Sequence, residues 1–165
     1  MMRFFFPVCP LLMTMPVIAG DPIPLAEGGF VAAWTVAGPL PAEVKDSAGV
    51  SHGGYYHDFL TAAGGERHAV PAEGDRIDFG PGKSVFWKTV LINPTGALDF
   101  ISIFEASTDS SGVAYAFSQL HSEIDQDVLL KVGSNDGVQI WLNENLVHDN
   151  HVSRGLTIGE DTVPV

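Results

Sequence analysis

The chain has 165 residues, and 8 Lys and Arg against 20 Asp and Glu give it a formal charge of −12. Its hydrophobic fraction of 45% suffices for a packed core, and its length fits one domain. The charge excludes a basic nucleic-acid-binding surface, because phosphate neutralisation needs clustered Lys and Arg. It also argues against binding to anionic membrane surfaces, so we expect no nucleic-acid partner and no membrane association after processing.

The first 19 residues have the pattern of a signal peptide. Arg3 provides a positive start, Phe4 to Ile18 are mostly apolar, and Ala19 ends a segment of the kind that signal peptidase reads. Three prolines make this stretch a poor spanning helix, and an uncleaved anchor is the alternative. We therefore expect residues 1–19 to be a signal peptide and the protein to be secreted, in the periplasm or outside the cell.

The only cysteine, Cys9, lies within this predicted leader. The processed chain is therefore expected to have no disulfide and to depend on core burial for its stability. Such a cysteine-free exported domain suits a bacterial envelope or secretome. Residues 20–29 are rich in Pro and Gly and are predicted to be a lead-in linker to a module that spans residues 30–165.

The remaining elements are predicted from apolar periodicity and turn residues. A strand is expected from Phe30 to Val36, ended by Pro39 and Pro41. One short helix is expected within Tyr55 to Gly65. Period-two alternation then predicts strands in these ranges: 84–92, 98–104, 112–123, 127–132, 138–142 and 146–148. So many strands with at most one short helix predict an all-β antiparallel sandwich.

The last residues, Thr162 to Val165, are predicted to begin a strand after a turn at Gly159 to Asp161. No closing strand follows them, and a sheet without it would expose an unpaired edge. We therefore expect the sandwich to lack its last strand, as in a truncated sequence or the first module of a longer protein.

The segment Gly133 to Asn143, GSNDGVQIWLN, carries a resemblance to known modules. It resembles the G-S-D-D-G-x-x-[VL]-W-[LV]-[ND]-G signature of secreted galactose-binding-like jelly rolls and, more distantly, of PA14-type domains. Further segments fit the same modules: 34–41, 58–60, 64–66, 114–116 and 147–154. The resemblance implies a jelly-roll β-sandwich of the kind attached to bacterial glycoside hydrolases and other exported enzymes.

Two positions depart from that signature. Asn135-Asp136 stands where an Asp-Asp pair is usual, which removes one acidic ligand and weakens any calcium site borrowed from the PA14 lectins. Asn143-Glu144-Asn145 replaces the usual Asn-Gly turn. Because Asn tolerates the left-handed conformation, we expect the hairpin to persist with another turn.

The same motif supplies the candidate binding residues. We expect Gly133 and Gly137 to permit a tight connection and Asp136 to bond its own backbone as an Asx-turn. With Val138, Ile140 and Leu142 in the core, alternation places Gln139, Trp141 and Asn143 on the other face.

Trp141 is the leading ligand-binding candidate, because an exposed indole beside Asn143 would stack on a sugar ring. The alternative is that Trp141 lies beneath residues 55–65 and fixes them to the sheet. Trp34 and Trp87 are expected in the core. The full candidate set is Asp136, Gln139, Trp141, Asn143 and Arg154.

Metal binding has two weak candidates, and no cofactor is expected. His148 and His151 would share a zinc ion only if the chain turns between them, because strand positions three apart face opposite ways. Asp136 and Asp149 could contribute oxygens to calcium, although capping of turns is the alternative use.

No catalytic motif is present: the sequence has neither a Gly-x-Ser-x-Gly elbow nor a His-Glu-x-x-His helix. We therefore expect no enzyme within these residues. The resemblance implies a non-catalytic accessory module that binds carbohydrate or supports an adjacent C-terminal catalytic domain. The alternatives are a structural or protein-interaction sandwich with Trp141 buried, and the N-terminal part of a larger secreted hydrolase.

Overall fold

The computed structural model describes residues 2–6, 29–92, 96–107 and 111–165. Strands dominate this part of the chain: β1 (Met2–Phe6), β2 (Ala33–Pro41), β3 (Glu43–Lys45), β4 (Ser51–Gly53), β5 (Arg76–Gly80), β6 (Lys83–Phe86), β7 (Lys88–Leu91), β8 (Gly112–Phe117), β9 (Leu129–Val132), β10 (Val138–Leu142), β11 (Asn145–Asn150) and β12 (Asp161–Pro164). The protein is an all-β, sandwich-like fold, as predicted. Residues 7–28, with Cys9, the predicted cleavage site and most of the linker, lie outside the described residues.

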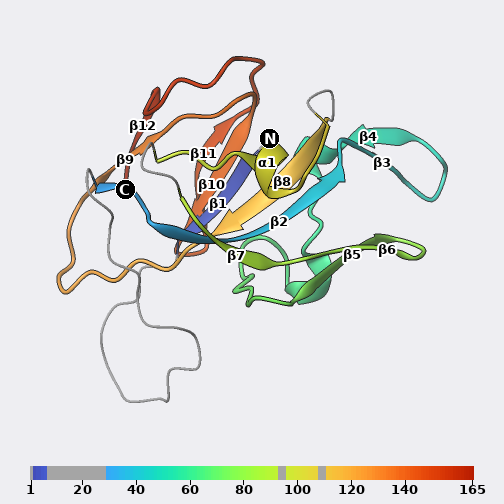
Figure 1. Ribbon diagram of the computed structural model, residues 1–165, viewed down its shortest axis with the longest axis horizontal. Coiled ribbons are helices and arrows are strands. Elements are labelled where there is room, and N and C mark those ends of the chain that lie inside the picture. The colour runs from blue at the N-terminus through green and yellow to red at the C-terminus, as the bar shows by residue number, and fades with distance from the viewer. Residues whose placement is uncertain (1, 7–28, 93–95, 108–110) are drawn as a thin grey trace.

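The centre of the fold is a six-stranded sheet with the order β11-β10-β1-β8-β2-β7 (Figure 1). Three two-stranded ribbons, β3–β4, β5–β6 and β9–β12, complete the strands. The pairs β2–β7, β2–β8 and β10–β11 are antiparallel, whereas β1 is parallel to both β8 and β10. Five residues of the predicted leader therefore form a strand in the middle of the sheet.

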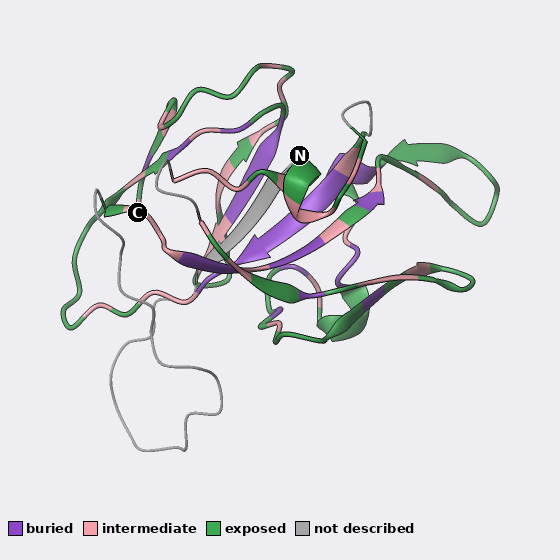
Figure 2. Ribbon diagram, in the orientation of Figure 1, coloured by how far each residue is buried: buried purple, intermediate pink, exposed green. Residues whose placement is uncertain are grey.

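Alternation along the strands gives the sheet two buried faces. On β8, Val113, Tyr115 and Phe117 point to one cluster, and Ala116 belongs to the other. We call the first the closed face; it packs against segment 59–87, chiefly through these side chains: Phe59, Leu60, Ala69, Ile77 and Trp87. The second, the open face, carries Trp34, Val36, Val138 and Ile140. In Figure 2 burial is nearly complete along β8, whereas β2 is interrupted at Pro39 and β10 becomes half-buried at its end.

The hairpin that follows the signature motif is confirmed. β10 pairs with β11, and Leu142 lies opposite Asn145, which leaves a two-residue turn. Both turn residues are left-handed, with φ of 46° at Asn143 and 67° at Glu144. Positive φ at both positions is typical of a type I′ turn, which matches the twist of the flanking strands. Asn143 tolerates this conformation, whereas Glu144 adopts it at the position where glycine is usual, so the hairpin persists with one unfavourable turn residue.

The strand predicted over residues 98–104 is wrong, because this segment contains the short helix α1 (Phe100–Ile103). Asp99 is its N-cap: the carboxylate accepts hydrogen bonds from the backbone N–H groups of Ile101 and Ser102. Phe100 and Phe104 stack one turn apart, with ring centroids separated by 5.5 Å. A capped turn with an aromatic pair at helical spacing outweighs the short period-two pattern.

The helix predicted within residues 55–65 is also wrong, since two short 3₁₀ turns, Gly54–Tyr56 and Thr61–Ala63, replace it. Asp58 lies between them, and its carboxylate accepts hydrogen bonds from the backbone N–H groups of Leu60 and Glu66. Such local side-chain bonds compete with a continuous helix. Gly64 ends the second turn at φ 92°, the role predicted for a terminal glycine.

Several strand boundaries differ from the prediction; β8, for example, ends at Phe117 and not at residue 123. β2 continues past Pro39 to Pro41, because a register shift between Ala37 and Leu40 accommodates the prolines. The strand predicted over residues 84–92 divides at Trp87 into β6, which pairs with β5, and β7, which pairs with β2. Trp87 instead bonds Gly74 and Asp75 through its backbone, and its ring is buried on the closed face.

Candidate functional site

The signature loop that precedes β10 is tightly enclosed by other segments. A Cβ atom at Gly133 would lie 2.1 Å from the carbonyl oxygen of Thr157, and one at Gly137 would lie 2.6 Å from the ring of Tyr55. Both distances are shorter than real Cβ contacts. The two glycines are therefore required by the close approach of these neighbours, and not by a left-handed backbone.

Asp136 does not form the predicted Asx-turn. Its backbone is left-handed at φ 61°, and its carboxylate Oδ1 accepts hydrogen bonds from the Ser153 hydroxyl (3.2 Å) and the Arg154 N–H (3.3 Å). The Asp136 N–H in turn donates to the Arg154 carbonyl at 2.9 Å. Since these partners lie 17 and 18 residues away, Asp136 fastens the signature loop to the loop after β11.

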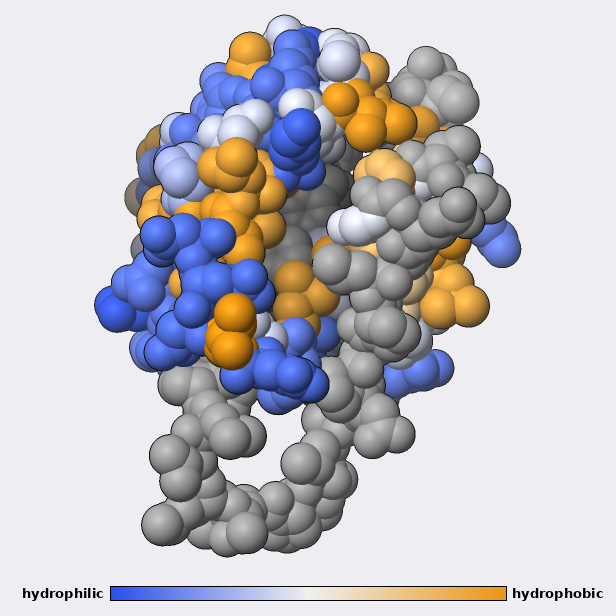
Figure 3. Space-filling model, turned by 90° about the vertical axis from the view of Figure 1, so that its left-hand side faces the viewer, coloured by the Kyte–Doolittle hydropathy of each residue, from blue (hydrophilic) through white to orange (hydrophobic). Residues whose placement is uncertain are grey.

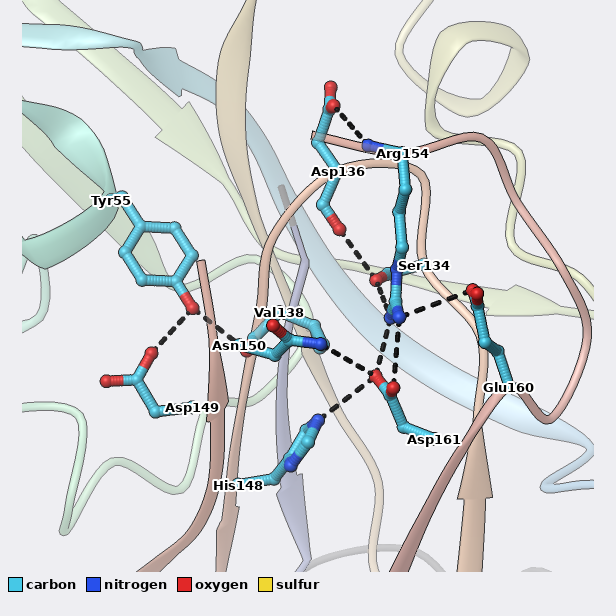
Figure 4. A network of polar contacts seen from close by, with 10 residues as sticks. All are labelled: Tyr55, Ser134, Asp136, Val138, His148, Asp149, Asn150, Arg154, Glu160 and Asp161. Carbon is cyan, nitrogen blue, oxygen red and sulfur yellow. Dashed lines mark hydrogen bonds and ion pairs between the residues drawn. The ribbon is translucent and has the colours of Figure 1, made fainter. Parts of the chain in front are cut away.

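Arg154 is the centre of a polar network that joins several segments (Figure 4). Its two Nη atoms donate to the two carboxylate oxygens of Asp161, at 2.9 and 2.5 Å. Nη2 also donates to the Ser134 hydroxyl, and Nη1 lies 3.2 Å from a carboxylate oxygen of Glu160. The bidentate geometry is the strong form of an Arg–carboxylate pair. The end groups of this candidate binding residue are thus engaged within the protein.

Asp161 receives bonds from the six-stranded sheet as well. His148 Nε2 lies 3.0 Å from its Oδ2, and the Asn150 amide donates to the same oxygen at 3.5 Å. Because Asp161 belongs to β12 and both of these partners belong to β11, the network ties the β9–β12 ribbon to the sheet.

The network shifts the pKa values of its ion pair. The hydrogen bonds from Arg154 hold the pKa of the Asp161 carboxyl far below its usual range, with smaller effects of His148 and Asn150 and against the effect of burial. The bond to Asp161 raises the pKa of Arg154. Both side chains are only 14% exposed, so solvent screens the pair weakly. The pair remains ionised at neutral pH.

The residues of the predicted sugar platform on β10 differ in exposure. Gln139 is 6% exposed and fully within the core. Trp141 is half-buried and packs against the closed-face cluster, which includes Phe59 and Leu60 from the segment expected to cover it. Its indole Nε1 is buried without a hydrogen-bond partner among the described residues. Asn143 is exposed in the hairpin turn. Trp34 and Trp87 are 6% and 3% exposed, which confirms their assignment to the core.

The candidate metal ligands have other partners. Asp149 Oδ1 accepts a hydrogen bond from the Tyr55 hydroxyl at 2.7 Å, and the same hydroxyl lies 2.9 Å from the Val138 carbonyl. The His151 ring stacks on Tyr55 with a centroid distance of 4.1 Å, whereas His148 contacts Asp161. Over residues 2–6, 29–92, 96–107 and 111–165, no three His, Cys, Asp or Glu side chains form a group suited to a metal ion.

An apolar groove of about 1270 Å³ lies on the open face. Its apolar lining includes Trp34, Leu98, Phe100, Phe104, Leu130 and Val132. The signature loop 133–137 and the loop 151–159 form its polar border. Exposed Leu156 and Ile158 lie on that border. Figure 3 shows this side of the molecule hollowed and bordered by hydrophobic side chains.

Sequence reasoning missed Ser134, Tyr55 and Asp161 as parts of this region. Ser134 was inside the motif, and its hydroxyl donates to the Asp136 carbonyl at 2.7 Å. Tyr55 bonds Val138, which lies 83 residues further along the chain. Asp161 bonds Arg154, which lies 7 residues before it. One sequence signal could have indicated the ion pair: Arg154 is a single basic residue that is followed by the acidic residues Glu160 and Asp161.

Among the helices that the structure describes, none has the length and apolar character needed to cross a membrane. Comparisons of the chain with protein-family models, with curated proteins and with solved structures find no match. The resemblance to galactose-binding-like and PA14-type modules thus stays a prediction from the motif.

Proposed function

We propose that this chain is a non-catalytic accessory module of an exported protein, and that it supports a neighbouring polypeptide domain through the groove on its open face. The groove is the observation that carries the proposal. Its lining is mainly aliphatic and aromatic, and its border adds Leu156 and Ile158, which are 52% and 58% exposed. Open apolar surface of this kind is typical of a contact with another polypeptide.

Val165 lies close to one wall of this groove. Its N–H and carbonyl bond Val128, immediately before β9, and Leu129 to Val132 of β9 line the groove. A polypeptide joined to Val165 would emerge beside the groove. The other candidate groups favour support over small-ligand binding, because Gln139 is buried and the end groups of Arg154 are engaged in the network.

Carbohydrate binding is the second candidate, and Tyr56 is the observation that favours it. This ring is 64% exposed and is held edge-on against Tyr55 and His151, at centroid distances of 4.7 and 5.4 Å. An exposed ring held in one orientation is suited to stacking on a sugar. This site would replace the one predicted at Trp141.

Two measurements on the full chain distinguish these functions. The first is fluorescence of 8-anilinonaphthalene-1-sulfonate, an apolar probe, with the native chain, a Leu156→Ser and Ile158→Ser double variant, and a Val50→Ser and Val70→Ser control at exposed positions outside the groove lining. The support function predicts that only the groove variant loses probe fluorescence. The second is retention in gels that contain soluble polysaccharides. Retention that Tyr56→Ala abolishes would replace the first proposal by the second.

A further inference from the structure

The central strand β1 is exceptional in the six-stranded sheet. It runs parallel to both β8 and β10, whereas the other strand pairs between described residues are antiparallel. Since β8 and β10 point the same way, a strand between them in the opposite direction would make every neighbouring pair in this sheet antiparallel. Antiparallel ladders are slightly more stable per residue than parallel ones. The position thus suits a strand of the opposite direction better than β1.

The strands that flank this position are buried on both faces. On the open face, Ala114 and Ala116 of β8 lie near Val138 and Ile140 of β10, all at most 6% exposed. On the closed face, β8 contributes Tyr115, and β10 contributes Gln139 and Trp141. A strand enclosed on both faces is expected to be a nearly continuous apolar run. Met2–Phe6, the segment present, reads MRFFF and has four apolar residues of five.

Removal of this segment would leave a large defect. The edges of β8 and β10 that now pair with Met2–Phe6 would lose their hydrogen-bond partners. Buried backbone groups without partners are costly, and a free apolar strand edge promotes aggregation. A chain processed after Ala19 therefore needs another strand at this position.

We propose that the position between β8 and β10 is a strand-acceptor site. Met2–Phe6 fills it in the unprocessed chain, and after removal of the leader an extended apolar strand from the neighbouring polypeptide enters it, antiparallel to β8 and β10. The inference rests on the proposed export and support function. The incoming strand has four to six residues, apolar on both faces, and no proline in its middle, because its N–H groups must complete the ladders.

The test uses the full chain with Cys9→Ser, a site-specific protease sequence in place of residues 17–22, and Ala114→Cys as a reporter. Ala114 lies opposite Met2, at the start of the ladder with β1. Two probe peptides of alternating valine and phenylalanine carry an activated cysteine at either the N-terminal or the C-terminal end. The folded chain is cut and mixed with each peptide, and the disulfide adducts are measured by mass.

Antiparallel entry places the C-terminal end of the peptide at Ala114→Cys. We expect the C-terminal-cysteine peptide to give about tenfold more adduct than the other, a ratio that needs a preference of only about 1.4 kcal/mol. The uncut chain should react with neither. If cutting unfolds the chain, the peptide should restore its β-sheet circular dichroism.

Four results would overturn the proposal. These are preference for the N-terminal-cysteine peptide, equal reaction of cut and uncut chains, adducts at a Leu146→Cys control on the outer strand β11, and disulfide-linked pairs of the cut chain instead of peptide adducts. Failure of the export proposal is detected separately. It would appear as an unprocessed mass of the protein recovered from an exporting host, whereas the peptide experiment does not use signal peptidase.

Discussion

The two faces of the central sheet are built from alternate residues of the same strands, yet they are covered differently. On the closed face, Trp87 and Tyr115 pack together, and the Tyr115 hydroxyl donates to the buried Glu66 at 2.6 Å. On the open face, the cover consists of α1 and the β9–β12 ribbon, and a groove of about 1270 Å³ remains beside them. Apolar side chains pack both covers onto the sheet, and the Arg154–Asp161 network additionally anchors the second.

This difference indicates that the closed face stabilises the fold, whereas the open face keeps apolar surface accessible. A closely packed face resists changes in volume, because protein interiors are as dense as organic crystals. A cover fastened by polar groups at one end leaves apolar surface accessible without loss of the fold.

Truncation of the two buried tryptophans should separate the faces most strongly. Trp87→Ala leaves an enclosed cavity on the closed face and should lower the free energy of unfolding by about 3–5 kcal/mol. Trp34 lies on the wall of the groove, so Trp34→Ala only enlarges existing space. Its loss in the free energy of unfolding should be about 1 kcal/mol smaller, because less new cavity is created. Denaturant unfolding of both variants measures the difference. Equal losses would show that the groove does not relieve the open face.

The signature loop should not accept even one methyl group at Gly133. Because a Cβ there would meet the backbone of Thr157, Gly133→Ala should destabilise the chain by about 2–3 kcal/mol through overpacking. Gly155→Ala is the matched control, since nothing lies within 4 Å of its added Cβ. Thermal unfolding compares the two variants, and a tolerated Gly133→Ala would contradict the placement of loop 151–159.

Loss of the Asp161 carboxylate should release the cover of the open face. Asp161→Asn should cost about 2 kcal/mol, in the range of hydrogen bonds to charged groups, because Arg154 loses its bidentate partner. The exposed pair Arg76–Asp78, with both side chains 58% exposed, provides the control. Asp78→Asn should cost less than about 1 kcal/mol. Similar effects in urea unfolding would contradict a special role for the network.

The same carboxylate should make stability depend on acid. The pKa of Asp161 is lower in the folded protein than its unfolded value of about 3.9, so its contribution is complete above that pH. It is lost as the pH falls through the folded pKa. The stability advantage of the native chain over Asp161→Asn should therefore shrink as pH falls below about 4. Unfolding curves at a series of pH values test this, and a constant difference would refute it.

The fold class was predictable because it depends on local patterns. The alternation of Val138, Ile140 and Leu142, followed by Asn143, which tolerates left-handed backbone, is sufficient to predict a hairpin. Residues 98–104 show where this fails. Their alternation is too short to distinguish a strand from one helical turn, and the Asp99 cap decides the outcome.

The site was less predictable, because its geometry is made by residues far apart in sequence. Alternation correctly placed Trp141 away from Val138 and Ile140, but could not reveal that segment 59–87 makes that side a second core. Likewise, Asp136 has the chemistry of an Asx-turn, and only the fold brings Ser153 and Arg154 within reach of its carboxylate. The strand position of Met2–Phe6 was also hidden, because an apolar leader and a buried strand have similar composition.

The most direct test of the central claim is thiol labelling on the two faces in a Cys9→Ser background. Ala106→Cys lines the groove, and Ala69→Cys lies in the closed-face cluster at 7% exposure. We expect a fluorescent maleimide to label Ala106→Cys nearly as fast as in the unfolded chain. Ala69→Cys should react about a hundredfold more slowly, because its exposure requires local unfolding. Equal protection of the two cysteines would show that the open face is closed, and would contradict the account.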